Sequence, residues 1–278
     1  MRTGPIDILM VTYDRPGHTR LSLPRLLDTC DESMRVWLWH NGTHEETLEI
    51  VRSNASHPRV HEFRHSVENV RLREPTNWFW SRATGDYLAK VDDDNLMPDG
   101  WGQTLRAAHE AEPRLGVIGC WSFRPEDHLP ELAARKVRPL GGGHRLLQNC
   151  WVAGTGHLLK RRCIDEQGAL ADGQTFTNWC VQLAARGWIH GWYYPFLYME
   201  NMSDPRSEYT DVRTEEDFQS RRGLSAQRFG VKTLEQSRRR QPLHARRLQT
   251  CSTDPRDYLG WRGRARRWLR RLRPGESL

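Results

Sequence analysis

Hydrophobic residues occur in short, nearly continuous runs, and each run is followed by a longer stretch in which apolar residues recur at helical spacing. The first run, residues 6–12, has the composition of a strand buried on both faces, as in a parallel sheet. Glycine, proline and charged residues separate the runs from the helical stretches. We therefore predict strands at 6–12, 35–39, 60–64, 87–91, 115–121 and 189–194, with helices at 17–30, 43–54, 75–84, 100–111 and 176–186.

Strands that alternate with helices predict an α/β fold with a doubly wound, mostly parallel sheet. At 278 residues the chain is long enough for one large domain and an appendage. The alternation weakens after Trp121, where residues 122–143 are rich in proline, arginine and glycine. A loop of this length inside a domain is typical of a lid or a binding loop.

The positive charge is concentrated at the end of the chain. Residues 206–278 contain 19 Lys and Arg against 9 Asp and Glu, whereas residues 1–205 contain 23 against 26. This asymmetry predicts a catalytic domain at 1–205 and a basic, helical C-terminal extension at 206–278.

An acidic stretch follows the predicted strand at 87–91. Asp92, Asp93 and Asp94 are adjacent, and in an α/β sheet ligands gather at the carboxyl ends of strands. Mg²⁺ and Mn²⁺ prefer carboxylate oxygens and commonly share them with substrate phosphates. The triplet is therefore a candidate metal site, and the alternative is a solvated acidic turn that caps the helix beginning near Gly100.

Composition limits the cellular setting. The mean hydropathy is −0.78, and no apolar run approaches the roughly 20 residues of a membrane span. The six cysteines are scattered without a CxxC pair, and residues 1–5 lead into a strand without a signal-peptide core. We expect a cytoplasmic protein without structural zinc or disulfides.

Four sequence features occur in a specific order. The first strand ends in Thr12-Tyr13-Asp14-Arg15, and the second in His40-Asn41-Gly42-Thr43. Asn77 precedes Asp86 by nine residues, and the strand that begins Gly-Asp-Tyr leads into Asp-Asp-Asp-Asn. Over roughly residues 5–195 this order resembles glycosyltransferase family 2, the nucleotide-diphospho-sugar transferases of the GT-A fold. The spore-coat polysaccharide type is similar in the residues Asp-Asp-Asn…Met-Pro-Asp at 93–99.

The resemblance implies a nucleotide site at these strand ends. Tyr13 would stack on the base beside Thr12, and Arg71 would face the nucleotide. Asn41 would also bind the nucleotide. His40 occupies the place where the family usually has an aspartate that reads the base edge, which weakens the assignment of uracil. Asp94 would ligate Mg²⁺ or Mn²⁺ directly, with Asp92 as a second ligand, while Asp92 or Asp93 reaches the ribose or metal-bound water. The alternative for these polar residues is ordinary turn and loop polarity.

The general base is less well defined. Inverting members of the family have an acidic residue at the start of the late helix, where this chain has Gln174, and an amide cannot accept a proton. Asp172, two residues earlier, is the predicted base, with Glu200 and Asp204 as reserves, although Asp172 could simply cap the helix.

We therefore expect a metal-dependent, inverting glycosyltransferase that moves a sugar from a nucleotide diphosphate donor, with a UDP-sugar favoured, to a hydroxyl or amine acceptor. The alternatives are a sugar-1-phosphate nucleotidyltransferase and a catalytically impaired nucleotide-sugar-binding protein. The former needs a glycine-rich basic loop after the first strand, which residues 12–17 do not provide.

The tail contains a second amphipathic segment. Residues 258–273 carry seven arginines, and their tryptophans and leucines recur at helical spacing. Such a helix suits the anionic inner face of a membrane. Docking of its apolar stripe on the catalytic domain is the alternative, and nucleic acid is disfavoured because no binding motif accompanies the charge.

Overall fold

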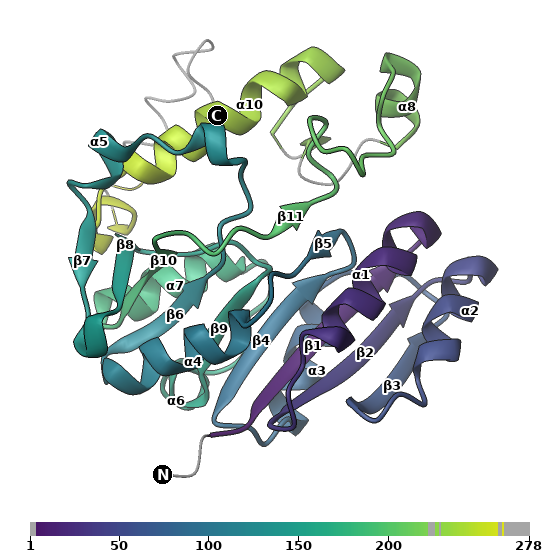
Figure 1. Cartoon of the computed structure of the whole chain (residues 1–278), viewed down its shortest axis with the longest axis horizontal. Coiled ribbons are helices and arrows are strands. Elements are labelled where there is room, and N and C mark those ends of the chain that lie inside the picture. The colour runs from purple at the N-terminus through teal and green to yellow at the C-terminus, as the bar shows by residue number, and fades with distance from the viewer. Residues whose placement is uncertain (1–3, 222–225, 228, 261–262, 264–278) are drawn as a thin grey trace.

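The core of the molecule is a nine-stranded sheet with the order β3-β2-β1-β4-β9-β6-β10-β8-β7 (Figure 1). The computed structural model describes residues 4–221, 226, 227, 229–260 and 263. Strands β1, β2, β3 and β4 are mutually parallel, as are β6 and β10, whereas β7, β8 and β9 pair in antiparallel fashion. The expected doubly wound, mostly parallel α/β sheet is confirmed.

The strands follow the apolar runs of the sequence closely. The sheet is built from β1 (Ile6–Tyr13), β2 (Met34–Asn41), β3 (Val60–Ser66), β4 (Tyr87–Asp92), β6 (Leu115–Gly119), β7 (Val137–Pro139), β8 (Arg145–Asn149), β9 (His157–Lys160) and β10 (Ile189–Tyr194). A separate antiparallel pair is formed by β5 (Asn95–Leu96) and β11 (Glu200–Asn201).

The helices cover both faces of this sheet (Figure 1). They are α1 (Pro16–Asp28), α2 (Glu45–Asn54), α3 (Arg73–Arg82), α4 (Trp101–Ala111), α5 (Pro130–Ala133), α6 (Arg161–Gln167), α7 (Phe176–Ala185), α8 (Glu215–Ser220) and α10 (Leu234–Thr250).

Alternate residues of β1 belong to two different cores. Ile8 and Met10 pack in the cluster that includes residues of α1, α2 and α4. Leu9 and Val11 pack in the cluster that includes residues of α3 and α7. Because successive side chains of a strand point to opposite faces, the continuous apolar run supplies both cores at once.

The long irregular segment is more ordered than the sequence suggested. Residues 122–143 contain α5, two short 3-10 turns and the edge strand β7 rather than an open loop. The buried Asp127 carboxylate accepts two hydrogen bonds from the guanidinium of Arg206, which also pairs with buried Asp204. These contacts attach the segment to the chain that follows β11.

The segment after residue 205 also packs on the sheet domain. In α10, Ala245 and Leu248 are buried in the second core, and the Gln249 amide donates to the backbone carbonyl of Asp127. The boundary at 205 therefore remains a prediction. Of the predicted amphipathic helix at 258–273, all but residues 258–260 and 263 lie outside the described residues. No helix within the described residues has the length and apolar character needed to cross a membrane.

One buried histidine gives the stability of the fold a testable pH dependence. His190 in β10 is fully buried, and burial lowers its pKa to about 3. An unfolded histidine titrates near 6.5, so between these values the unfolded chain binds a proton that the folded chain does not, and the contribution present above pH 6.5 is lost toward pH 3. We expect His190→Leu to reduce the loss of unfolding free energy between pH 7 and pH 5 by roughly 1–2 kcal/mol, measured by urea denaturation.

The comparison with the unsubstituted chain is needed because other groups titrate in the same range. Burial raises the pKa of Asp93 to about 7, which changes stability with pH in the opposite sense. Exposed His61 provides the control, since His61→Gln should keep the original pH dependence. Equal pH dependence in His190→Leu and the unsubstituted chain would contradict the prediction.

Candidate active site

Three parallel strands end side by side at one edge of the sheet. In the register of β1 with its neighbours, Thr12 lies opposite His40, Tyr13 opposite Asn41, and Val11 opposite Asp92. The three polar segments identified in the sequence are therefore neighbours in space. Carboxyl ends of parallel strands are the usual position of a ligand site in this class of fold.

Tyr13 forms an exposed aromatic surface at this edge. Its side chain is 45% exposed, although it ends a strand that is otherwise buried. A Cβ atom at Gly42 would lie 3.1 Å from Cε2 of the Tyr13 ring, and Gly42 has a φ of +85°. Glycine at this position therefore allows the backbone to approach the ring. The arrangement leaves the Tyr13 ring available for stacking.

His40 and Thr12 lie beneath the surface and contact each other. The two residues are fully buried, with Nδ1 of His40 2.9 Å from Oγ1 of Thr12. Burial is the main cause that lowers the pKa of His40 to about 4, and neighbouring His65 acts in the same direction. His40 is therefore neutral at physiological pH.

Asn41 is also engaged within the protein. Its Oδ1 accepts a hydrogen bond from the Trp39 indole, and its Nδ2 donates to the carbonyl oxygen of Arg71. Arg71 has a φ of +62°, an uncommon backbone conformation for a residue with a side chain. The amide of Asn41 thus connects the end of β2 to the loop that precedes α3.

The three acids of the triplet have different surroundings. Asp93 is buried, and its Oδ2 accepts a hydrogen bond of 2.9 Å from the backbone N–H of Tyr13. Burial, followed by the charge of Asp94, raises the pKa of Asp93 to about 7. Asp94 is partly exposed, and so is Asp92. The triplet is therefore not a uniform cluster, because one carboxylate has a structural partner and two face outward.

Cations from elsewhere in the chain balance the outer acids. The guanidinium of Arg15 lies 3.1 Å from Oδ2 of Asp94, and it also donates to Oγ of Ser203. Ser203 in turn donates to Asp94 over 2.6 Å. The ammonium of Lys90, in β4, pairs with the Asp92 carboxylate.

Arg15, Lys90 and Ser203 were not predicted from the sequence as site residues. A lysine in an otherwise apolar strand, two residues before an aspartate, was the available signal for Lys90, because strand residues two apart share a face. Arg15 belongs to the polar segment at the end of the first predicted strand, but no role was predicted for its side chain. No local signal marked Ser203, which is 109 residues from Asp94.

The acids suit a divalent ion only in combination with other ligands. Within the described residues no three His, Cys, Asp or Glu side chains form a group that could hold a metal. Asp94 and Asp92 offer carboxylate oxygens that are partly exposed, and Mg²⁺ typically takes one or two carboxylates with substrate phosphates and water. The residues therefore fit an ion that arrives with a diphosphate.

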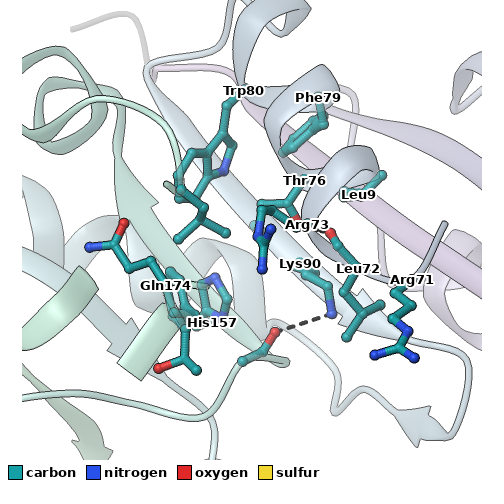
Figure 2. Close-up of a pocket in the computed structure, with 15 residues that line it drawn as sticks. Leu9, Arg71, Leu72, Arg73, Thr76, Phe79, Trp80, Lys90, His157 and Gln174 are labelled. Atoms are coloured by element: carbon teal, nitrogen blue, oxygen red, sulfur yellow. Dashed lines mark hydrogen bonds between the residues drawn. The ribbon is translucent and has the colours of Figure 1, made fainter. Parts of the chain in front are cut away.

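A pocket of about 280 Å³ lies next to the triplet, between α3 and the start of α7. Figure 2 shows the side chains of Arg73 and Lys90 extending toward its middle, with Arg71 at one edge and Gln174 at the other. Lys90 also donates to the carbonyl of Gly154 over 3.2 Å. Because Lys90 pairs with Asp92, it connects the pocket to the acids.

The start of the late helix is attached to α3. The Asn77 amide donates to the carbonyl of Leu170 and accepts from its N–H, both at 2.9 Å. The Asp172 side chain is fully exposed and pairs with Arg73 over 2.9 Å. Gln174 lines the pocket, and its amide contacts Gln182.

The two reserve acids differ in availability. Asp204 is 3% exposed and held by Arg206, so its carboxylate is part of the ion cluster with Asp127. Glu200 is half-buried in β11, opposite Leu96. The choice of Asp172 as base is not tested by this placement and remains a prediction.

Comparisons with known proteins agree with this architecture. Residues 7–162 match the model of glycosyl transferase family 2. A mannosyltransferase, PcManGT from Pyrobaculum calidifontis in complex with GDP-Man and Mn²⁺, is similar in structure with a TM-score of 0.60 and 18% identity, over 89% of this chain and 70% of that chain. TarS 1–349 from S. aureus is similar with a TM-score of 0.54 and 11% identity, over 95% of this chain and 92% of that chain. A structure of TarS 1–349 in complex with UDP-GlcNAc matches with the same TM-score of 0.54 over 88% of this chain and 70% of that chain. These likenesses show the GT-A fold.

Removal of the Asn77 amide should loosen the start of the late helix. Asn77→Ala leaves the backbone N–H and carbonyl of Leu170 without their partner, which costs roughly 1–3 kcal/mol where such groups are buried. We expect lower unfolding free energy and faster hydrogen exchange at the Leu170 amide. Ser81→Ala, at an exposed position of the same helix, should change neither. Unaltered exchange at Leu170 in Asn77→Ala would show that the loop is held by other contacts.

Proposed function

The chain belongs to glycosyl transferase family 2, and we propose that this glycosyltransferase moves a sugar from a nucleotide diphosphate donor to an acceptor with the help of Mg²⁺ or Mn²⁺. The single observation that carries the proposal is the position of an exposed Tyr13 ring at the strand edge that also holds Asp92 and Asp94. An aromatic ring for a base and carboxylates for a metal–diphosphate group are the two parts that such a donor requires.

The proposed donor site divides into a base region and a phosphate region. The base stacks on Tyr13, and the Tyr13 backbone is held in place by the Asp93 carboxylate. Asp94 and Asp92 hold the ion, which when bound supplies charge neutralisation for the leaving diphosphate. Arg15 and Lys90 lie beside these acids and provide further positive charge.

Two similar structures contain donors with different bases. The solved mannosyltransferase was obtained with GDP-Man, and TarS 1–349 with UDP-GlcNAc. We favour a UDP-sugar, although His40 is buried against Thr12 and does not offer the carboxylate that would read a base edge. For a neutral hydroxyl acceptor and an inverting reaction, Asp172 remains the predicted base.

Loss of the Tyr13 ring should weaken nucleotide binding. Stacking between a base and an aromatic side chain is worth about 1–3 kcal/mol, so Tyr13→Ala should raise the Kd for UDP or GDP roughly tenfold or more in the presence of Mn²⁺, as measured by titration calorimetry. Tyr13→Phe keeps the ring and should bind as the unsubstituted chain does. Equal affinity in Tyr13→Ala would place the base elsewhere.

Loss of the Asp94 carboxylate should remove metal-dependent activity. Asp94→Asn takes one charged ligand from the ion, and we expect at least about a hundredfold loss of donor hydrolysis and sugar transfer with little change in unfolding free energy. Asp99→Asn is the matched control, because Asp99 is an acid close in sequence whose side chain is 87% exposed. Full activity in Asp94→Asn, or activity that is indifferent to a chelator, would contradict the metal assignment.

A further inference from the structure

The pocket between α3 and α7 combines apolar walls with positive charge and has no acidic lining residue. The fifteen described residues that line it include Arg71, Arg73 and Lys90 but neither Asp nor Glu. We propose that this pocket binds the acceptor, and that the acceptor is an amphiphile whose attacking atom is an anionic oxygen, of a phosphate or a carboxylate, attached to an apolar group. This inference rests on the proposed glycosyltransferase function and specifies its acceptor.

The walls of the pocket favour an apolar group over a sugar. Phe79, Trp80, Leu170 and Phe176 line it, and Leu9 closes it from the sheet (Figure 2). A hexose would need hydrogen-bond partners for its hydroxyls on all sides, and the two threonine hydroxyls among these walls already make hydrogen bonds within the protein. Thr76 donates to the carbonyl of Leu72, and Thr175 accepts from the N–H of Asn178.

The size of the pocket limits the apolar group. At roughly 30 Å³ for each small group of atoms, a volume of about 280 Å³ accommodates about eight or nine methylene-sized groups. A short alkyl chain or the proximal part of a longer one fits this space. The pocket therefore suits a chain whose charged end lies beside Arg71, at the edge of the pocket.

The three cations that line the pocket favour an anion beside them. Lys90 is paired with Asp92, and Arg73 with Asp172. The Arg71 guanidinium makes no hydrogen bond or ion pair within the part of the chain that the structure describes. The Arg73–Asp172 pair joins an exposed carboxylate to a partly exposed guanidinium, and such pairs are worth little, so Arg73 can turn toward a bound anion at small cost.

An anionic acceptor also removes the need for a base in the pocket. A hydroxyl must lose a proton as it attacks, and the lining residue nearest to the expected acid is the amide of Gln174. A phosphate or carboxylate oxygen attacks the anomeric carbon directly, the new C–O bond forms, and the C–O bond to the diphosphate breaks. The electron pair of that bond leaves with the nucleoside diphosphate, and no proton is transferred.

The test compares acceptors of equal chain length and different charge. Full-length protein with Mn²⁺ is given UDP-GlcNAc or GDP-Man and one of octyl phosphate, octanoate, 1-octanol or inorganic phosphate, and the glycosylated product is measured. We expect octyl phosphate or octanoate to be glycosylated at least tenfold faster than 1-octanol, and inorganic phosphate to be a poor acceptor. The first two compounds distinguish a phosphate from a carboxylate nucleophile.

The opposite outcomes are specific. Faster transfer to 1-octanol, with a hundredfold loss in Asp172→Asn, would overturn the proposal and establish a base-assisted reaction on a neutral acceptor. Equal rates of transfer to inorganic phosphate and to octyl phosphate would overturn the proposal that the acceptor carries an apolar group. Donor binding and hydrolysis without transfer to any of the four compounds would overturn the acceptor assignment alone, whereas absence of donor binding would overturn the proposed function.

Binding measurements locate the site independently of turnover. Arg71→Gln should raise the Kd for octyl phosphate, followed by tryptophan fluorescence, at least fivefold more than it raises the Kd for UDP or GDP. Leu72→Ser, at a partly exposed lining position, should also weaken the binding of octyl phosphate. Arg82→Gln, at the opposite end of α3, is the matched control and should leave octyl phosphate binding unchanged. A larger loss for the nucleotide than for octyl phosphate in Arg71→Gln would assign Arg71 to the donor and overturn its role at the acceptor.

Discussion

The hydrogen bond from the Tyr13 N–H to the buried carboxylate of Asp93 is the contact on which the geometry of the site depends. It joins the ends of β1 and β4. The backbone carbonyl of Asp93 accepts a further hydrogen bond from the hydroxyl of Ser22, which lies in α1. Through its carboxylate and its backbone carbonyl, Asp93 thereby connects the Tyr13 backbone, the first helix and the acidic turn. Its neighbours Asp92 and Asp94 remain at the surface because Asp93 takes the buried position.

The sheet and the acidic triplet were predictable because their signals are local. Continuous apolar runs identify strands buried on both faces, and three acids after such a run mark its carboxyl end. The position of β9 between β4 and β6 was not predictable in the same way, since residues 157–160 follow a glycine-rich segment and pair with strands about 40 to 70 residues earlier in the chain. The edge strand β7 was missed because Val137–Pro139 is too short to show a period.

The partners of the acids were not predictable for a related reason. Side chains that neutralise Asp94 come from the loop after β1 and from the segment after β11, at sequence separations of 79 and 109 residues. Such contacts depend on how the two ends of the domain meet, which periodicity does not encode. The pairing of Asp204 was not predictable for the same reason, because Arg206 is two residues away but its other partner, Asp127, comes from the segment before α5.

The proposed acceptor pocket and the proposed donor site differ in the interactions that would hold their ligands. Asp92, Asp93 and Asp94 each have a cation or a backbone N–H beside them, so the proposed metal–diphosphate group would have to displace partners already present, such as Arg15 on Asp94. In the pocket the walls are largely apolar, and the Arg71 guanidinium makes no hydrogen bond or ion pair within the described residues. Burial of an apolar chain there would release water, and an anion beside Arg71 would meet a guanidinium that has no ion pair within the described residues. In the proposed function the donor is therefore selected through exchange of existing ion pairs, and the acceptor through apolar surface and the Arg71 guanidinium.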